Sequence, residues 1–367
     1  MNRTQTPVTA AIIGLGVIGG SIGLALRTAS PQVTVVGFDK RNVLRRAKKR
    51  GAIEIAASSL RDALSDADVV FVCTPVSSIL KLLPEISRLV KPGAIVTDVG
   101  SVKEVIQSCA QRYFRTGGIF IGGHPMAGSE GSGIEYADAL LFQNAVYVLC
   151  PLRKKERGIG RLAPMLKSIG ARVLIMDARR HDESAAAVSH LPQLLAVALM
   201  DFAARNNVRN PALFQLAAGG FRDMTRIASS PFPIWKDILS QNKVQVRSIL
   251  REYEMALKQL EKDLSKKSLA AVGRKFLRAK SFRDSIPRNS KGFLHSLHDV
   301  VVSVDDKPGV LAKMTSALFA AGINISDIEL MKVREGQGGT FRLSFETGEA
   351  AISAAKALRA KGIRVAE

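Results

Sequence analysis

The stretch Ala11–Asp39, AIIGLGVIGGSIGLALRTASPQVTVVGFD, decides the fold of this 367-residue chain. It begins as an apolar strand, turns through Gly14, Gly16 and Gly19, continues as an apolar helix and returns as a second strand ending at Asp39. A strand, a glycine turn, a helix and a second strand with a terminal acid predict a dinucleotide-binding α/β domain of the Rossmann type.

A glycine is needed at each of these three positions for a physical reason. Gly14 permits the tight turn, Gly16 lets the backbone approach a pyrophosphate, and Gly19 lets the helix pack closely on the strand. The N-terminus of the helix offers unpaired N–H groups and the positive end of its dipole to the phosphates. We therefore expect a bound dinucleotide rather than a Rossmann fold without one.

Asp39 favours NAD over NADP, because a carboxylate accepts hydrogen bonds from the ribose hydroxyls and repels a 2′-phosphate. Lys40 and Arg41 follow directly and weaken that preference. Thr74 ends the buried strand Val69–Cys73 and is a further expected contact of the cofactor.

Composition narrows the class of protein. The chain is 47% hydrophobic but only 5% aromatic, which predicts aliphatic cores, and its length suggests two or three domains. Cys73, Cys109 and Cys150 are widely separated, which argues against a disulfide framework or a zinc site, so we expect no metal. The uncharged run Ala10–Leu26 holds five glycines and fits strand, turn and helix, so we expect no membrane span or signal peptide and a cytoplasmic protein.

The formal net charge is +21. The bases cluster in Lys40–Arg50, Arg153–Arg161 and Lys262–Lys291 without interleaved aromatic residues, so a solvated basic surface is expected rather than a nucleic-acid site. Such a surface also favours capture of a polyanionic substrate.

The chain divides into three predicted domains. Strands and helices alternate over residues 1–177, which predicts a doubly wound sheet, and residues 178–290 have helical periodicity without a good strand. The predicted helices there are Glu183–Arg205, Pro211–Phe221, Ile234–Leu264 and Ser268–Asp284. Part of the first is apolar nearly all round, so we expect it to be buried, in the monomer or in a homodimer. After a linker, Ser285–Leu297, residues 297–367 have βαββαβ order and predict a ferredoxin-like α+β domain.

Two motifs follow strands of the predicted sheet, DVGSVK at Asp98–Lys103 and GGHPMAGSE at Gly122–Glu130. Both loops should open at the carboxyl edge of the sheet, where a nicotinamide would lie. His124 is the candidate general base, since the imidazole pKa lies near working pH. Ser101 is expected to hydrogen-bond to that imidazole and orient it.

The helical segment carries two more motifs. In SHLPQ, Pro192 should kink the helix and turn His190 toward a cleft, although a structural role is the commoner explanation of a single histidine. In GGFRDMTRIA the glycine pair at Gly219 should break a helix, and Arg222 and Arg226 should share one helical face, where an arginine fork binds a carboxylate. Trp235, just beyond, fits a packing role.

GLGVIGGSIGLALR, DVGSVK, HPMAGSE, SHLPQ and GGFRDMTRIA, in this order, resemble the prephenate dehydrogenase family, and DDKPGVLAKMTSALFAAGINISDIEL resembles an ACT domain, the small amino-acid-sensing module. The resemblance covers nearly the whole chain. It implies NAD-dependent oxidation of prephenate to 4-hydroxyphenylpyruvate with loss of carbon dioxide, on the way to tyrosine.

The resemblance also implies roles for particular residues. His124 matches the histidine that contacts the ring hydroxyl of the substrate, Ser101 the serine that positions it, and Arg226 the arginine that binds a carboxylate. His190 matches a second active-site histidine, and Gly219 and Trp235 fall where the family has active-site residues.

In the ACT segment, the resemblance points to two loops that commonly frame an effector. The matching residues are Asp306, Pro308, Gly309 and Asn324. Feedback inhibition by tyrosine is the implied regulation. An ACT-like domain that only helps the chain to oligomerise is the alternative.

Three other functions remain open. An arogenate or dual-specificity cyclohexadienyl dehydrogenase would perform the same chemistry on a substrate with an amine in place of the side-chain ketone. A β-hydroxyacid dehydrogenase would need a catalytic lysine where this chain has His190. A non-catalytic sensor of NAD and an amino acid would have no use for His124 and Arg226 beside the nicotinamide.

Overall fold

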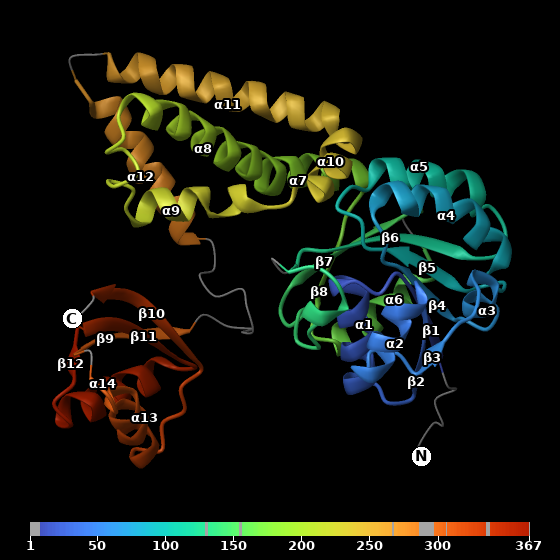
Figure 1. The fold of residues 1–367 in the computed structure, drawn as a ribbon, viewed down its shortest axis with the longest axis horizontal. Coiled ribbons are helices and arrows are strands. Elements are labelled where there is room, and N and C mark those ends of the chain that lie inside the picture. The colour runs from blue at the N-terminus through green and yellow to red at the C-terminus, as the bar shows by residue number, and fades with distance from the viewer. Residues whose placement is uncertain are drawn as a thin grey trace. The chain divides into compact units, whose positions relative to one another are not determined.

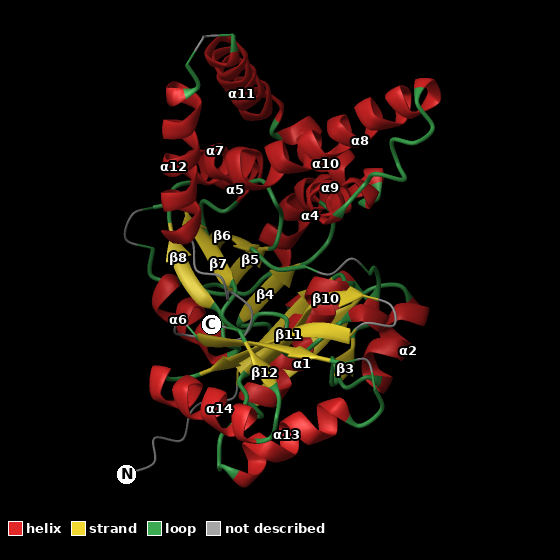
Figure 2. Ribbon diagram, turned by 90° about the vertical axis from the view of Figure 1, so that its left-hand side faces the viewer, coloured by secondary structure: helices red, strands yellow, loops and turns green. Residues whose placement is uncertain are grey.

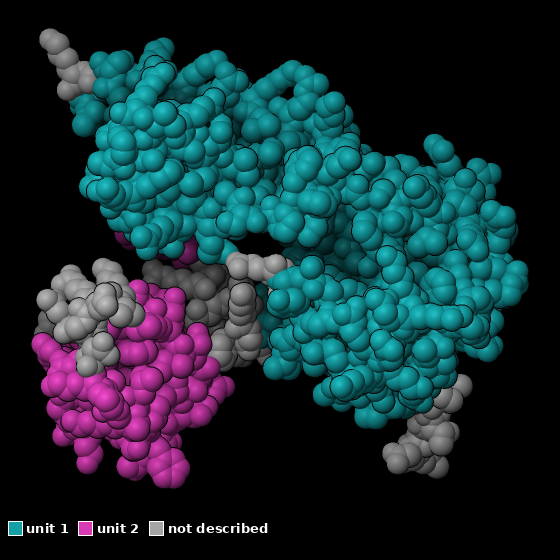
Figure 3. Space-filling model, in the orientation of Figure 1, with its two compact units in different colours: residues 1–275 teal, residues 276–367 magenta. Residues whose placement is uncertain are grey.

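The computed structural model describes residues 8–128, 131–153, 156–265, 268–285, 297–305, 307–334 and 338–366. They form two compact units, Met1–Lys275 and Phe276–Glu367, which Figure 3 colours separately. The first unit holds the sheet together with most of the helical segment, so the predicted boundary at residue 177 stays a prediction. Most of the predicted linker lies outside the described residues.

The first unit is built on an eight-stranded sheet in the order β3-β2-β1-β4-β5-β6-β7-β8 (Figures 1 and 2). Neighbouring strands are parallel except β6 and β7, which are antiparallel. Because β1 pairs with both β2 and β4, the winding reverses there, and a ligand crevice is expected at the carboxyl ends of the strands. The predicted α/β Rossmann domain is confirmed. Its strands are β1 (Val8–Ile13), β2 (Val33–Phe38), β3 (Ile55–Ala56), β4 (Val69–Val72), β5 (Ile95–Asp98), β6 (Ile119–Pro125), β7 (Val146–Pro151) and β8 (Arg172–Ile175).

Helices cover both faces of this sheet, and the alternation of side chains along β1 shows why. Ala10 and Ile12 enter the core under one set of helices, whereas Ala11 and Ile13 enter the core under the other. The first set is α1 (Val17–Ala29), α2 (Arg41–Lys49) and α6 (Ile159–Ser168), and the second is α3 (Leu60–Leu64), α4 (Val76–Leu89) and α5 (Glu104–Tyr113). A short 3₁₀ turn, η1 (Ile134–Tyr136), packs over the N-terminal half of α1.

The helical segment continues the chain beyond β8. Its elements are α7 (Ala178–Ala185), the π-helical turn η2 (Ala186–His190), α8 (Leu191–Arg209), α9 (Gly219–Thr225), the 3₁₀ turn η3 (Arg226–Ser229), α10 (Phe232–Gln241), α11 (Lys243–Leu264) and α12 (Ala270–Ser285). The distortion expected at Pro192 is present as the π turn just before it, since proline has no N–H for the regular helical bond. Asp237 of α10 accepts a hydrogen bond from Ser77 Oγ at 2.8 Å and so ties the segment to α4.

The predicted helix Pro211–Phe221 is wrong. Residues 211–216 form turns, and the helix α9 begins at Gly219 instead of ending there. Asparagine side chains fold this connection: Asn210 Oδ1 accepts from Ala212 N and Asn207 Oδ1 accepts from Phe214 N, both at 3.3 Å. Such local bonds compete with the helical ones.

The run of helix over residues 178–209 is less buried than its apolar sequence predicted. Only 33% of its most apolar window is buried within this chain. It is long and apolar enough to span a membrane by length and composition alone, a test that core helices of globular domains also pass. Val197, Phe202 and Val208 are exposed on α8.

The second unit contains an antiparallel four-stranded sheet in the order β10-β11-β9-β12, with two helices packed on it. Its elements are β9 (His298–Val304), α13 (Val310–Ala320), β10 (Asp327–Arg334), β11 (Gly338–Phe345), α14 (Gly348–Ala360) and β12 (Arg364–Val365). The predicted βαββαβ order and ferredoxin-like α+β class are confirmed.

Candidate active site

The glycine turn has the geometry that a dinucleotide requires. Gly14 has a φ of 94°, which L side chains rarely adopt. A Cβ on Gly19 would lie 2.0 Å from the carbonyl oxygen of Gly14, so the helix and the turn touch without room for a side chain. A Cβ on Gly16 would meet nothing within 4 Å, which leaves open space for a phosphate at the start of α1.

Asp39 lies beside this turn at the end of β2. Its Oδ2 accepts a hydrogen bond from Leu15 N at 2.7 Å, and its Oδ1 accepts one from Lys40 N at 2.6 Å. The carboxylate is therefore fixed against the glycine turn, where its remaining acceptor positions suit ribose hydroxyls.

A cavity of about 260 Å³ opens at the carboxyl ends of β4 and β5. Thr74, Gly100 and Ser101 line it from the sheet side, and Ile234 and Ile238 of α10 line it from the helical side. The hydroxyl of Thr74 is buried, and among the described residues it has no hydrogen-bond partner. An orphaned buried hydroxyl beside the glycine turn fits a residue that completes its hydrogen bonding with a bound dinucleotide.

His124 is buried in β6 itself, so the predicted loop position is wrong. It pairs with Val148 of β7 in antiparallel register near the carboxyl end of β6. Ser129 and Glu130, the end of the motif, lie outside the described residues. A strand holds the imidazole more rigidly than a loop, which suits a group that must meet a substrate in one geometry.

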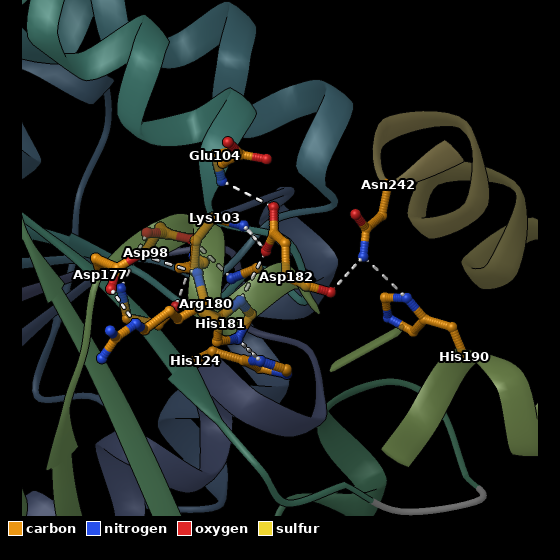
Figure 4. A network of polar contacts seen from close by, with 12 residues as sticks. Asp98, Lys103, Glu104, His124, Asp177, Arg180, His181, Asp182, His190 and Asn242 are labelled. Atoms are coloured by element: carbon orange, nitrogen blue, oxygen red, sulfur yellow. Dashed lines mark hydrogen bonds and ion pairs between the residues drawn. The ribbon is translucent and has the colours of Figure 1, made fainter. Parts of the chain in front are cut away.

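The hydrogen-bond partner of His124 is His181 of α7, not the predicted Ser101. Nδ1 of His124 and Nε2 of His181 are 2.7 Å apart (Figure 4). The second ring nitrogen of His181, Nδ1, lies 2.7 Å from Oδ1 of Asp182. Among the described residues, no hydrogen bond joins Ser101 to His124, and Ser101 instead lines the cavity at Thr74.

A buried ion pair lies behind the histidines. Lys103 Nζ pairs with Asp98 Oδ2 and also donates to the carbonyl oxygen of Gly123 at 2.7 Å. Asp98 Oδ1 accepts from Gly123 N at 3.1 Å, so both backbone groups of the residue before His124 are bound by this pair. The ion pair therefore fixes the strand end that carries the imidazole.

Burial is the main cause that lowers the pKa of His124 well below its usual 6.5, and any positive charge on the neighbouring His181, Lys103 or His190 adds to the effect. A histidine with a lowered pKa is neutral at neutral pH, which is the form of a general base.

His190, at the end of η2, is buried and bonded to the helical segment. Its Nδ1 lies 3.2 Å from Asn242 Nδ2, and its ring meets Trp235 edge to face with centroids 6.1 Å apart. Burial lowers the pKa of His190 to about 4, against the opposing charge of Asp182. This histidine is therefore neutral at neutral pH and acts through hydrogen bonds rather than charge. Trp235 packs on it and on the core under α4.

Arg226 begins η3 and is exposed, as is Gly219 at the start of α9. We expected Arg222 and Arg226 to share one face of a single α-helix, and this prediction is wrong. Arg222 lies in α9, which ends at Thr225, whereas Arg226 begins the 3₁₀ turn η3. Gln193 of SHLPQ donates through Nε2 to the carbonyl oxygen of Ile227 at 2.9 Å, which ties the arginine turn to α8.

The second unit has its own cavity, of about 400 Å³, between β9, α13 and β12. Pro308 and Gly309 line it, together with the cationic side chains of Lys307, Lys313 and Arg364. Asn324 is exposed in the connection before β10, and Asp306 lies outside the described residues. Gly309 has a φ of 84° and caps α13.

The sequence pattern missed four residues of this site: His181, Asp182, Gln193 and Asn242. Asn242 donates to the carbonyl oxygen of Asp182 at 2.9 Å and so links His190 to the histidine pair.

The three cysteines are unpaired, and burial raises the pKa of Cys150 to about 12, so it is no nucleophile. Among the described residues, no group of three or more His, Cys, Asp or Glu could hold a metal ion.

A glycine turn, an acid held beside it and a buried histidine at the carboxyl edge of one sheet are typical of an NAD-dependent dehydrogenase. Sequence models of known families agree in detail. The nucleotide-binding domain of prephenate dehydrogenase matches residues 22–175, its dimerization domain matches residues 177–276, and the ACT domain matches residues 298–360.

The chain belongs to the prephenate dehydrogenase family. It is 34% identical to the prephenate dehydrogenase of Bacillus subtilis over 348 residues, which cover 94% of each chain. It therefore has NAD-dependent prephenate dehydrogenase activity in tyrosine biosynthesis.

Solved structures of two similar dehydrogenases have the same fold. The prephenate dehydrogenase of Aquifex aeolicus in complex with hydroxyphenyl propionate and NAD+ superposes with a TM-score of 0.71 at 29% identity, covering 77% of this chain and all of the other. The arogenate dehydrogenase of Synechocystis has a TM-score of 0.68 at 30% identity, covering 76% and 99%.

The position of Asp39 beside the glycine turn predicts that this residue discriminates between NAD and NADP. Replacing Asp39 by asparagine removes the charge that repels a 2′-phosphate, while Arg41 remains close by in sequence. We expect the ratio of kcat/KM for NAD to that for NADP to fall at least about tenfold, which corresponds to 1.4 kcal/mol. Initial rates of reduced-cofactor formation with each nucleotide measure this ratio, and an unchanged ratio would exclude Asp39 from discrimination.

Proposed function

We propose that His124 is the general base of prephenate oxidation. The observation that carries this proposal is a buried, neutral imidazole near the carboxyl end of β6, held through Nδ1 by His181. In that arrangement Nε2 of His124 is the nitrogen that meets the ring hydroxyl of the substrate.

The proton and electron balance explains why one base is sufficient. Bound NAD supplies the hydride acceptor. Nε2 of His124 takes the hydroxyl proton while the carbinol carbon loses its hydride, which makes the ring a dienone. The carbon–carboxylate bond across the ring then breaks, and its electron pair makes the ring aromatic as carbon dioxide leaves. The phenolate oxygen recovers the proton from His124, so the base is regenerated.

The remaining site residues hold the substrate. Arg226 binds a substrate carboxylate through its guanidinium fork, and Gln193 positions the turn that carries it. His190, which is neutral, contributes a hydrogen bond to the substrate. Ser101 lines the cavity beside the ring hydroxyl, and Gly219 and Trp235 border the site. The basic surface of the chain favours arrival of the doubly charged prephenate.

The second unit supports regulation by an amino acid. We place the effector in the cavity at Pro308 and Gly309, where Lys307, Lys313 and Arg364 outnumber Asp305, the carboxylate that pairs with two of them, and so suit a further carboxylate. Asp306 and Asn324 belong to the same two predicted loops. Tyrosine, the end product, is the proposed effector and inhibitor. The exposed apolar side chains of α8 and the dimerization domain support a homodimer.

Arogenate is the second candidate substrate, because the Synechocystis arogenate dehydrogenase has the same fold at 30% identity. Formation of NADH at 340 nm, with NAD and prephenate or arogenate, with and without tyrosine, tests the proposal. We expect turnover of prephenate that tyrosine suppresses. Turnover of arogenate alone would change the substrate, and tyrosine-insensitive turnover without tyrosine binding would leave the ACT domain an oligomerisation module. Binding of NAD without any turnover would favour a sensor.

A further inference from the structure

The buried contact between His124 and His181 fixes which nitrogen of each ring carries a proton. As a carboxylate, Asp182 offers only acceptors, so His181 Nδ1 must donate across the 2.7 Å contact with Asp182 Oδ1. In its neutral form His181 then has a lone pair on Nε2, and His124 must donate to it from Nδ1. This leaves the lone pair of His124 on Nε2, the nitrogen that faces the substrate hydroxyl in the proposed function.

Asp182 itself is rigidly held. Its Oδ1 accepts from Lys103 N at 2.7 Å and its Oδ2 accepts from Glu104 N at 2.9 Å, at the start of α5. A carboxylate at a helix N-terminus is stabilised by the unpaired N–H groups and the dipole. Asp182 and His181 are 1% and 2% exposed, so little water competes with the contact between them.

We propose that His181 is a positioning residue for the reaction: it fixes the base-competent tautomer of His124 and transmits to it the negative charge of Asp182. The inference rests on the proposed role of His124 and deepens it. When His124 takes the substrate proton, it becomes an imidazolium in a site that already holds Lys103. The contact with His181 then lets the carboxylate of Asp182 stabilise that charge until the phenolate takes the proton back.

Other groups around the histidine pair do not supply this stabilisation. Asp98, at the end of β5, and Lys103, in the connection to α5, neutralise each other in the ion pair described above. His190 of η2 is neutral and bonded to Asn242, and Tyr147 of the neighbouring strand β7 carries a buried hydroxyl whose pKa burial raises well above its usual value. Asp182 is therefore the anion that acts on His124 through a hydrogen-bonded partner.

Two substitutions at His181 separate a positioning role from simple packing. His181→Phe keeps an aromatic ring but removes both hydrogen bonds, so both tautomers of His124 become populated and its imidazolium loses the carboxylate. We expect kcat to fall at least about tenfold, with KM for prephenate and NAD unchanged, because a wrong tautomer impairs a base that is otherwise in place. The acidic limb of the kcat profile should move to lower pH, since His124 becomes a weaker base.

His181→Gln has an amide that donates to Asp182 and a carbonyl that accepts from His124, so it should recover most of the kcat lost in the phenylalanine variant. If His181→Phe fails to fold, His181→Gln still tests the inference. The pH profile of kcat for His181→Gln should stay close to that of the wild type. Fluorescence of Trp235 monitors folding in both variants.

The inference is overturned if His181→Phe keeps the wild-type kcat and acidic limb, if its loss is confined to KM, or if folded His181→Gln shows no recovery. A fully active His124→Asn variant would instead refute the proposed base. An inactive His124→Asn beside a fully active His181→Phe would refute the inference alone.

Discussion

Replacing Lys103 by methionine is expected to destabilise the first unit by about 3–5 kcal/mol, because the buried carboxylate of Asp98 loses its counter-ion. Lys103 and Asp98 are 1% and 0% exposed, so water cannot replace the ammonium group. The carbonyl oxygen of Gly123 would lose a donor as well. Urea denaturation followed by the fluorescence of Trp235 reports on this unit, since Trp235 is the one tryptophan of the chain.

A double variant, Lys103→Met with Asp98→Asn, is the matched control. It removes both charges, so the isolated buried carboxylate no longer exists and part of the lost stability should return. Lys91→Met is a second control, because the Lys91–Asp68 pair, 2.9 Å apart, is partly exposed. Such a pair contributes about 0–1 kcal/mol. A loss below about 1 kcal/mol for Lys103→Met would contradict the structural role assigned to the ion pair.

His124→Asn is expected to lower kcat by about 10²–10⁴-fold, the usual contribution of a positioned general base. Asparagine keeps a polar side chain in β6 but accepts no proton, so KM for prephenate and NAD should change little. His298→Asn is the matched control, since His298 is exposed on β9 of the second unit. Steady-state rates of NADH formation give both parameters, and normal turnover by His124→Asn would remove the residue from the mechanism.

The same chemistry sets the pH dependence of the wild type. Because burial lowers the pKa of His124, the imidazole stays neutral as the pH falls through 6.5, and activity is kept until the pH reaches the lowered value. An acidic limb of kcat/KM below pH 6.5 is therefore expected.

The glycine turn could be predicted from sequence because its evidence is local. Gly14, Gly16 and Gly19 lie within six residues, and the structure confirms the steric reasons given for Gly14 and Gly19. The order of strands and helices follows equally from hydrophobic patterning, and both units have the predicted class. The short elements β3, α3 and η1 were absent from the expected order, and the single helix expected over Ile234–Leu264 is divided into α10 and α11.

The partner of His124 could not be predicted in this way. His181 lies 57 residues further along the chain, in a polar stretch with no motif. It reaches the imidazole only because α7 packs against α5, where Asp182 caps the helix. Ser101 was expected to be this partner because it lies in a neighbouring motif, but the connection after β5 places it in the cavity beside Thr74.

The turn η3, which begins at Arg226, is a second feature that the sequence did not predict. Helical spacing between Arg222 and Arg226 was a fair expectation from sequence, but the chain changes to a 3₁₀ turn at Arg226. Gln193, which bonds to this turn from α8, is distant in sequence and gives no local signal.

Single-turnover formation of NADH by His124→Asn, mixed in a stopped-flow instrument with saturating NAD and prephenate, measures directly whether His124 is the base of the chemical step. It isolates the chemical step from product release, and the substrate dissociation constant is measured in parallel. We expect unchanged binding of prephenate and NAD and a chemical step slowed by at least about 100-fold. A chemical step at the wild-type rate would show that another group takes the proton from the ring hydroxyl.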